Sequence, residues 1–363
     1  MTNQVFNFCA GPAALPVPVM KKAQQELLNW RGLGVSVMEV SHRSAEYQEL
    51  ANKAESDLRK LLGIGDSHAV LFMHGGASLQ FSNIPMCLLS DGREGEYIQN
   101  GVWSGKAGQE AARYGNTNII DALHIDMDGK RSLVPETEWE RSDKPAYTHY
   151  TPNETIEGIQ FHSIPSSNGP IIADMSSCIL SEKINIDDFD MIYAGAQKNI
   201  GPAGMTIVII KRSFMEQMNF DRVPKVFNYE VQAKNGSMVN TPPTYTWYLA
   251  GLVFEWLIEN GGVDEMSKRA QERAQKLYSF IDQDDFYTNP IDQSCRSLMN
   301  IPFILKDENL NSLFLSQAEK NGFIGLKGHR SVGGMRASIY NSMPIEGVIA
   351  LIEFMQEFKR QNG

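Results

Sequence analysis

The sequence predicts an α/β protein, with a large domain built on a mostly parallel sheet and a smaller C-terminal α+β domain. A strand, a glycine turn and the start of a helix follow one another at residues 69–79, which is the building unit of such folds. Several later apolar segments have the length of strands. A pair of glycines, Gly261 and Gly262, then separates two helical patterns, and we place the domain boundary there.

The first predicted elements are a helix and the strand–turn–helix unit. Residues 45–62 form an amphipathic pattern whose apolar side chains recur at helical spacing, at Tyr47, Leu50, Ala51, Ala54, Leu58 and Leu61. Residues 69–73 are expected to form a strand, and a second helical pattern begins at Leu79.

Five further strands are predicted in the large domain. They are short and almost continuously hydrophobic, which is typical of a sheet covered on both faces. These segments are residues 119–123, 146–150, 171–175, 191–194 and 205–210.

The C-terminal part alternates between helical and strand patterns. Residues 245–260 are helical and rich in Trp and Leu, and a charged helix is expected at residues 264–281. The remaining predicted elements are a strand at 300–305, a helix at 310–321, a strand at 336–340 and a helix at 345–360. This order predicts a compact α+β domain.

Composition excludes several classes of function. The net charge of −10 disfavours nucleic-acid binding, because such binding requires a basic surface. The longest apolar runs are too short to span a membrane, and residues 1–12 lack the pattern of a signal peptide, so we expect a cytoplasmic protein. The four cysteines are scattered without a CxxC pair, and no metal is implied.

The sharpest chemical signal is Lys198, which follows a predicted buried strand through a turn of small residues. A buried ammonium is unfavourable unless it is paired or neutralised, and a Schiff base with a carbonyl cofactor neutralises it. Taken alone, Lys198 is better explained as a surface lysine at a strand end.

Asp174 makes the chemical interpretation stronger. It ends the predicted strand at 171–175, at the edge where α/β sheets bind ligands. Pyridoxal phosphate works as an electron sink when its pyridine nitrogen stays protonated, and an ionised Asp favours that state. An isolated Asp at this place is more often a helix cap or a turn residue.

The third signal is the turn formed by Gly75, Gly76, Ala77 and Ser78, between a strand and a helix. Free backbone N–H groups and the helix dipole at such a turn can bind a phosphate. Many strand-to-helix loops contain glycine, so this turn alone is weak evidence. Together with Asp174 and Lys198, in this order along the chain, it is much stronger evidence for a cofactor site.

Several separated stretches now resemble one family, the phosphoserine aminotransferases of the class V, fold-type I pyridoxal-phosphate enzymes. The resemblance extends over nearly the full length. The most specific stretches are Ala194-Gly195-Ala196-Gln197-Lys198-Asn199 and Gly328-His329-Arg330-Ser331-Val332-Gly333-Gly334-Met335-Arg336-Ala337-Ser338. The others are residues 6–12, 36–43, 152–155 and 240–244.

The resemblance implies a seven-stranded, mostly parallel sheet in a large domain of residues 16–260, with residues 1–15 and 261–363 forming the small domain. It also implies pyridoxal phosphate as the cofactor and a homodimer with shared active sites. The implied cofactor contacts are Trp103 stacked on the ring, Thr155 near the ring hydroxyl, Gly76, Ala77, Ser78 and Gln197 on the phosphate, and Asn240 and Thr241 from the partner subunit. Some members have Gly-Arg where this chain has Ala77-Ser78.

The implied reaction moves an amino group from L-glutamate to 3-phosphohydroxypyruvate, in serine biosynthesis. The resemblance also implies a second reaction, the formation of 4-phosphohydroxythreonine in pyridoxine biosynthesis. Both substrates have an amino-acid end and a distal anion, so two basic sites are needed. Arg336 is the candidate for the α-carboxylate, since a guanidinium binds carboxylates bidentately. The candidates for the distal anion are His42, Arg43, His329 and Arg330. Lys198 is then the general base for the α-proton.

Two other functions fit part of the sequence. A class V desulfurase, or a transaminase that acts on serine or alanine with glyoxylate, would share the cofactor residues. Cys295 lacks a desulfurase motif, and the multiple Arg and His residues favour diacidic substrates over alanine. A non-catalytic α/β nucleotide-binding protein would use the glycine turn but leave Lys198 and Asp174 unexplained, and the G-x-G-x-x-G fingerprint is missing.

Overall fold

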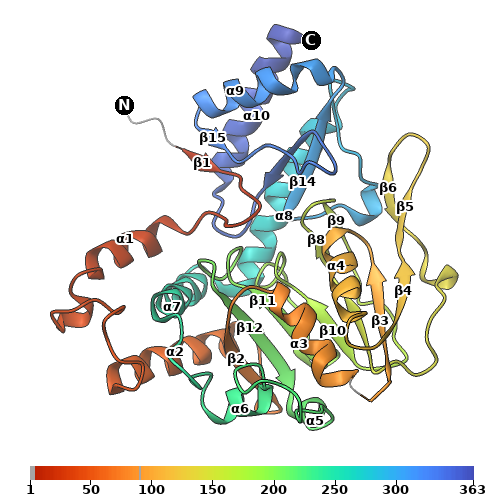
Figure 1. The fold of residues 1–363 in the computed structure, drawn as a ribbon. Helices are drawn as coiled ribbons and strands as arrows, with labels where there is room; N and C mark the ends of the chain where they lie inside the picture. The colour runs from red at the N-terminus through yellow and green to blue at the C-terminus, as the bar shows by residue number, and fades with distance from the viewer. Residues whose placement is uncertain (1–4, 90) are drawn as a thin grey trace.

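A seven-stranded sheet forms the centre of the larger part of the protein in the computed structural model, which describes residues 5–89 and 91–363 (Figure 1). Its strands are, in spatial order, β2 (His68–His74), β12 (Met205–Lys211), β11 (Met191–Gly195), β10 (Ile171–Asp174), β7 (Tyr147–Tyr150), β3 (Glu94–Gln99) and β4 (Asn116–Asp121). Strand β12 is antiparallel to both of its neighbours, and the remaining pairs are parallel. The predicted α/β class with a mostly parallel sheet is therefore confirmed.

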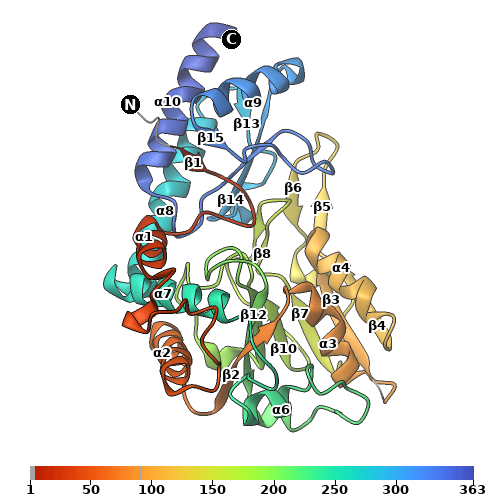
Figure 2. The same cartoon turned by 60° about the vertical axis from the view of Figure 1, so that its left-hand side comes forward.

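Helices cover both faces of this sheet (Figure 2). Helices α2 (Ala45–Leu62) and α7 (Thr244–Glu259) pack on one face, in a core with Phe72 and Ile207. Helices α3 (Ser78–Leu88) and α4 (Val102–Ala111) cover the other face, against Leu71 and Tyr193. Because β2 and β11 alternate side chains between the two cores, their sequences are hydrophobic almost throughout.

Strand β3 and helix α4 were not predicted from the sequence. Strand β3 has two glutamates within six residues, yet Glu96 is fully buried. Its carboxylate lies 3.5 Å from Arg141 and accepts hydrogen bonds from the backbone of Ser142 and the hydroxyl of Thr148. Long-range partners of this kind compensate a buried charge, and no local pattern reveals them.

The strand expected at residues 119–123 was placed too late in the sequence. Strand β4 ends at Asp121, Ala122 leaves the sheet, and Leu123–Ile125 forms β5, which pairs with β6 (Arg131–Leu133) in a separate hairpin. A run of apolar residues thus crosses from one sheet to another, because hydrophobicity does not specify the pairing partner.

The C-terminal part has a core of its own. An antiparallel sheet of β13 (Tyr287–Thr288), β14 (Asn300–Leu305) and β16 (Met335–Ser338) packs with α8 (Gly262–Ile281), α9 (Asn311–Lys320) and α10 (Ile345–Asn362). Strand β1 (Phe6–Asn7) joins this part through a parallel pairing with β15 (Phe323–Ile324).

Helix α8 lies between the two cores and contributes to both. Met266 belongs to the core of the large sheet, whereas Ala274 and Leu277 belong to the C-terminal core. We keep the division at residues 16 and 260 as a proposal, with α8 as the element that joins the two domains. Among the described residues, no helix is long and apolar enough to cross a membrane.

Candidate active site

A cavity of about 320 Å³ lies where several parallel strands of the large sheet end. Strands β2, β3, β7, β10 and β11 each lead at their carboxyl end into a segment that lines this cavity. The edge formed by such strand ends is the usual ligand site of α/β sheets. The predicted site residues that line it are Gly76, Ala77, Ser78, Trp103, Thr155, Asp174, Gln197, Lys198, His329 and Arg336.

Lys198 enters the cavity from the turn that follows β11. Its Nζ donates a 2.6 Å hydrogen bond to the hydroxyl of Thr155. Burial lowers the pKa of the Lys198 ammonium, and the nearby Asp174 and Glu154 only partly oppose that effect. A lysine with a lowered pKa supplies a neutral, nucleophilic amine closer to neutral pH.

Asp174 lies at the end of β10 and is 5% exposed. Its Oδ1 accepts hydrogen bonds from the backbone N–H (3.0 Å) and the hydroxyl (2.5 Å) of Ser176. Burial nevertheless raises the pKa of the Asp174 carboxyl above its ordinary value. A cation placed beside this carboxylate would therefore be strongly favoured.

A buried tyrosine and histidine extend the polar contacts of Asp174. The hydroxyl of Tyr193 opposes the rise in the pKa of Asp174 and lies 2.8 Å from Nε2 of His149. Burial lowers the pKa of His149 to about 3, so the imidazole is neutral near pH 7. These residues come from β7, β10 and β11, and the strand register pairs Asp174 with Tyr193.

The glycine turn after β2 leads directly into α3. Gly75 has a φ of +84°, and a Cβ at this position would lie 2.2 Å from Cδ1 of Leu79. The turn therefore requires glycine. Helix α3 begins at Ser78, and Leu79 and Gln80 donate their N–H groups to the carbonyls of Gly76 and Ala77. Among the described residues, the N–H groups of residues 76–78 have no backbone partner. They are suited to bind an anion.

Trp103 lies in the first turn of α4, with its ring centre 6.0 Å from Nζ of Lys198. Its indole Nε1 is buried without a hydrogen-bond partner among residues 5–89 and 91–363. Lys106, one turn later, holds its ammonium 4.5 Å from the same ring centre and also lines the cavity. The ring thus provides a flat apolar surface beside Lys198.

Arg336 reaches the cavity from β16 and is only 9% exposed. Its Nη1 donates to the carbonyl of Thr155 at 3.2 Å, while its Nε has no partner in the described part of the chain. The guanidinium therefore retains donors for a carboxylate. His329 also lines the cavity, with Nδ1 2.7 Å from the hydroxyl of Ser331.

The remaining predicted site residues are not part of this cavity in the single chain. His42 is half-buried, and Arg43, Arg330, Asn240 and Thr241 are exposed. Arg43 directly precedes the N-cap of α2, and Asn240 and Thr241 lie in the loop before α7.

Sequence reasoning missed two buried glutamates beside the cavity, Glu154 and Glu157. They flank Thr155, and their carboxylates accept hydrogen bonds from the backbone of α4. Two acidic residues in the stretch 153–157 were the only available signal, and their partners lie about 50 residues away in the chain.

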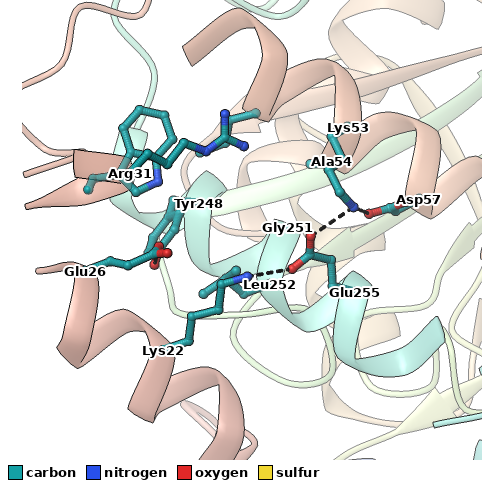
Figure 3. Close-up of a pocket in the computed structure, with 12 residues that line it drawn as sticks. Lys22, Glu26, Arg31, Lys53, Ala54, Asp57, Tyr248, Gly251, Leu252 and Glu255 are labelled. Atoms are coloured by element: carbon teal, nitrogen blue, oxygen red, sulfur yellow. Dashed lines mark hydrogen bonds and ion pairs between the residues drawn. The ribbon is translucent and has the colours of Figure 1, made fainter. Parts of the chain in front are cut away.

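A second hollow lies between α1 (Val17–Glu26), α2 and α7 (Figure 3). Its volume is about 60 Å³, and its charges are paired with one another: Glu255 contacts Lys22 at 3.1 Å and Lys53 at 3.0 Å, and Lys53 contacts Asp57 at 2.5 Å. This hollow is too small for a cofactor.

The large cavity suits pyridoxal phosphate in each of its parts. It offers an amine with a lowered pKa, a buried carboxylate, a helix N-terminus for the phosphate and an indole for the ring. Its volume lies in the range of small-molecule sites. Among the described residues, no group of three or more His, Cys, Asp or Glu is placed to hold a metal ion.

Comparison with known proteins gives one consistent result. The family model of class V aminotransferases matches residues 5–351. A phosphoserine aminotransferase of Acinetobacter baumannii is 56% identical over 360 residues, which cover 99% of this chain and all of the relative. The solved phosphoserine aminotransferase of Bacillus circulans subsp. alkalophilus has a TM-score of 0.95 at 42% identity, with both chains fully covered. That of Trichomonas vaginalis, with pyridoxal phosphate bound, has a TM-score of 0.91 at 38% identity, covering 97% of this chain and all of the other.

Proposed function

The chain belongs to the class V aminotransferase family, and from that membership we propose that it exchanges an amino group between L-glutamate and 3-phosphohydroxypyruvate. The products are 2-oxoglutarate and O-phospho-L-serine, in the phosphoserine aminotransferase reaction of serine biosynthesis. The observation that supports this proposal most strongly is the cavity that combines Lys198, Asp174 and Arg336 in a chain 56% identical to a phosphoserine aminotransferase.

Pyridoxal phosphate is the proposed cofactor, bound through Nζ of Lys198. When bound, it supplies an electron sink for the electron pair released from the substrate Cα–H bond. The N-terminal turn of α3, with Gly76, Ala77 and Ser78, binds the phosphate together with Gln197. Trp103 would pack against the ring, Asp174 would keep the ring nitrogen protonated, and Thr155, which contacts Lys198, would bind near the ring hydroxyl.

Lys198 moves the proton that the reaction requires. With substrate and cofactor bound, a free Nζ would take the proton from the substrate Cα and later return a proton. Burial lowers the pKa of this amine, which makes the neutral, basic form more available. Asp174 remains ionised beside the cationic ring nitrogen, because the attraction between them offsets the burial of its carboxylate.

Arg336 positions the substrate by its α-carboxylate. Its guanidinium lines the same cavity as Lys198, and its Nε has no partner among the described residues. His329 and Arg330 contribute to a second basic site for the distal carboxylate or phosphate. The same site accepts the longer phosphorylated oxo acid that leads to 4-phosphohydroxythreonine.

A homodimer completes the site in this proposal. His42 and Arg43 join the distal anion site, and Asn240 and Thr241 reach the cofactor phosphate, in each case from a second copy of the chain. Large apolar side chains are exposed along the N-terminal segment, where Val17 is 63%, Leu28 82% and Met38 52% exposed. Such a patch supports an interface between two copies. The proposed location of the dimer is the cytoplasm.

The proposal is tested by a coupled assay of 2-oxoglutarate formation from L-glutamate. The acceptors 3-phosphohydroxypyruvate, pyruvate and glyoxylate are compared at matched concentrations. We expect a strong preference for the phosphorylated acceptor, because only it provides an anion for the distal basic site. Equal or faster turnover of pyruvate or glyoxylate would retain the cofactor chemistry but refute the substrate assignment.

A further inference from the structure

Helix α4, which carries Trp103, begins without a side-chain cap of its own, because Gly101 occupies the N-cap position. Two glutamates from a distant segment take over that role. Glu154 accepts hydrogen bonds from the backbone N–H of Trp103 (3.2 Å) and of Ser104 (2.7 Å), and Glu157 accepts one from Val102 (3.2 Å). The first three N–H groups of the helix therefore depend on these two carboxylates.

The contact between the glutamates and the helix is close enough to exclude a side chain at Gly101. A Cβ at this position would lie 2.5 Å from Oε2 of Glu157 and 2.6 Å from Cδ of Glu154. Glu154 is fully buried and Glu157 is 5% exposed. Even one methyl group at position 101 would push the carboxylates away from the helix.

Thr155, one of the two residues between the glutamates, connects them with the rest of the cavity. Thr155 accepts the hydrogen bond from Nζ of Lys198 through its hydroxyl, and the one from Arg336 through its carbonyl. Trp103, Lys198 and Arg336 lie on α4, after β11 and on β16, respectively. All three are thus held from one segment of four residues.

This segment is itself firmly anchored. Strand β8 (Asn153–Glu154) pairs with β9 (Ile159–Gln160) in a tight hairpin. The side-chain amide of Asn153 donates to Ser177 at 2.8 Å and to Asn300 at 2.9 Å, so the hairpin contacts both the large sheet region and β14. A rigid hairpin keeps the groups that are hydrogen-bonded to it in fixed positions.

The charges explain why carboxylates act here. Burial, and then the neighbouring Glu157, raise the pKa of Glu154 to about 8. Below about pH 8 Glu154 is therefore largely protonated and the pair carries about one negative charge, which the N–H groups and the dipole of α4 favour at that end. Two apolar side chains would be easier to bury, but they could not fix the helix end.

We propose that Glu154 and Glu157 are positioning residues of the active site, which fix the start of α4 so that Trp103 faces the cofactor while Thr155 orients Lys198 and Arg336. The inference rests on the proposed function only for the identity of the cofactor and substrates. The two glutamates act through Trp103 and Thr155.

The test compares Glu154→Gln and Glu157→Gln with the control Glu96→Gln. Glu96 is equally buried and hydrogen-bonded but belongs to the sheet outside the cavity. In the holoenzyme, we expect Glu154→Gln to alter the visible circular dichroism of the cofactor and to lower kcat about tenfold, because the amide keeps only one of the two oxygens that accept hydrogen bonds from α4. In the protein without cofactor, amide hydrogen exchange at residues 102–104 should accelerate about tenfold. Glu96→Gln should change none of these readouts.

Gly101→Ala tests the same inference without removing a charge, and it decides the question if Glu154→Gln does not fold. It should reproduce the altered circular dichroism and the faster exchange at residues 102–104. Unchanged dichroism, kcat and exchange in the folded variants would overturn the inference. A wild-type protein that binds no cofactor would refute the proposed function instead, whereas the exchange measurement would still decide the role of the two glutamates.

Discussion

Lys198 shows how burial prepares a single side chain for chemistry. An exposed lysine holds its proton far above neutral pH, but this one lies in a cavity where desolvation lowers the pKa. Asp174 behaves in the opposite way, because burial raises the pKa of its carboxyl. Each group favours the charged form of the other, but for both of them burial outweighs this attraction.

The lowered pKa of Lys198 predicts the pH dependence of cofactor binding. The neutral amine is the form that reacts with an aldehyde, and in the folded protein it becomes populated at lower pH than in a free lysine. The rate at which the cofactor-free protein combines with pyridoxal phosphate should therefore rise with pH. It should level off at a pH below about 10.4, which is the ordinary pKa of a lysine side chain. Stopped-flow absorbance measures this rate.

N-acetyl-lysine amide, measured under the same conditions, corrects for the ionisation of pyridoxal phosphate itself. The profile of the protein should lie at lower pH than that of the small amine. Coinciding profiles, or a protein profile shifted to higher pH, would show that burial does not activate Lys198.

At the scale of elements, the turn between β2 and α3 makes the helix N-terminus available to a phosphate. Gly75→Ala should weaken the binding of pyridoxal phosphate about tenfold, because a methyl group 2.2 Å from Cδ1 and 3.2 Å from Cγ of Leu79 forces this side chain to move in the first turn of α3, beside the phosphate site. Fluorescence titration of the cofactor-free variant gives the dissociation constant.

Gly63→Ala is the matched control for this turn. Gly63 also has a positive φ, of +67°, at the C-cap of α2, but a Cβ there contacts nothing. Both substitutions introduce strain of about 1 kcal/mol, so both should lower the melting temperature. Only Gly75→Ala should change cofactor affinity, and equal affinities of the two variants would argue against the phosphate site.

The elements also show what could be predicted from the sequence. Helix α2 was predicted with its observed bounds, since its apolar residues recur at helical spacing and Gly63 ends it. Asp174 and Lys198 could be singled out because each directly follows or ends a hydrophobic strand. Strand β3 could not be predicted, because its buried Glu96 finds its partners in a segment more than 40 residues later. Glu154 and Glu157 were missed for the same reason.

At the scale of the whole molecule, the single chain leaves several predicted site residues outside the cavity. Arg43, Asn240 and Thr241 are exposed, and apolar side chains along the N-terminal segment are exposed as well. In the proposed dimer, both features have one explanation, because a second copy covers the apolar surface and brings these polar residues to the opposite cavity.

Mixing two inactive variants tests this arrangement. Lys198→Ala chains and Arg43→Ala chains are unfolded together, refolded and assayed with 3-phosphohydroxypyruvate. If Arg43 acts across the interface, each mixed dimer has one intact site, and random pairing should restore about a quarter of wild-type activity. Each variant refolded alone is the control. Activity no higher than that of the separate variants would place Arg43 in the same chain as Lys198, or outside the site.

The proposed role of Lys198 as the lysine that holds the cofactor can be tested by trapping the bond between them chemically. The yellow holoprotein is reduced with borohydride, which fixes the bond between cofactor and lysine, and is then digested and mapped by mass spectrometry. We predict the mass of the reduced cofactor on the peptide that contains Lys198 and on no other lysine peptide. A label on another lysine, or no label at all, would contradict the assignment of this cavity as the active site.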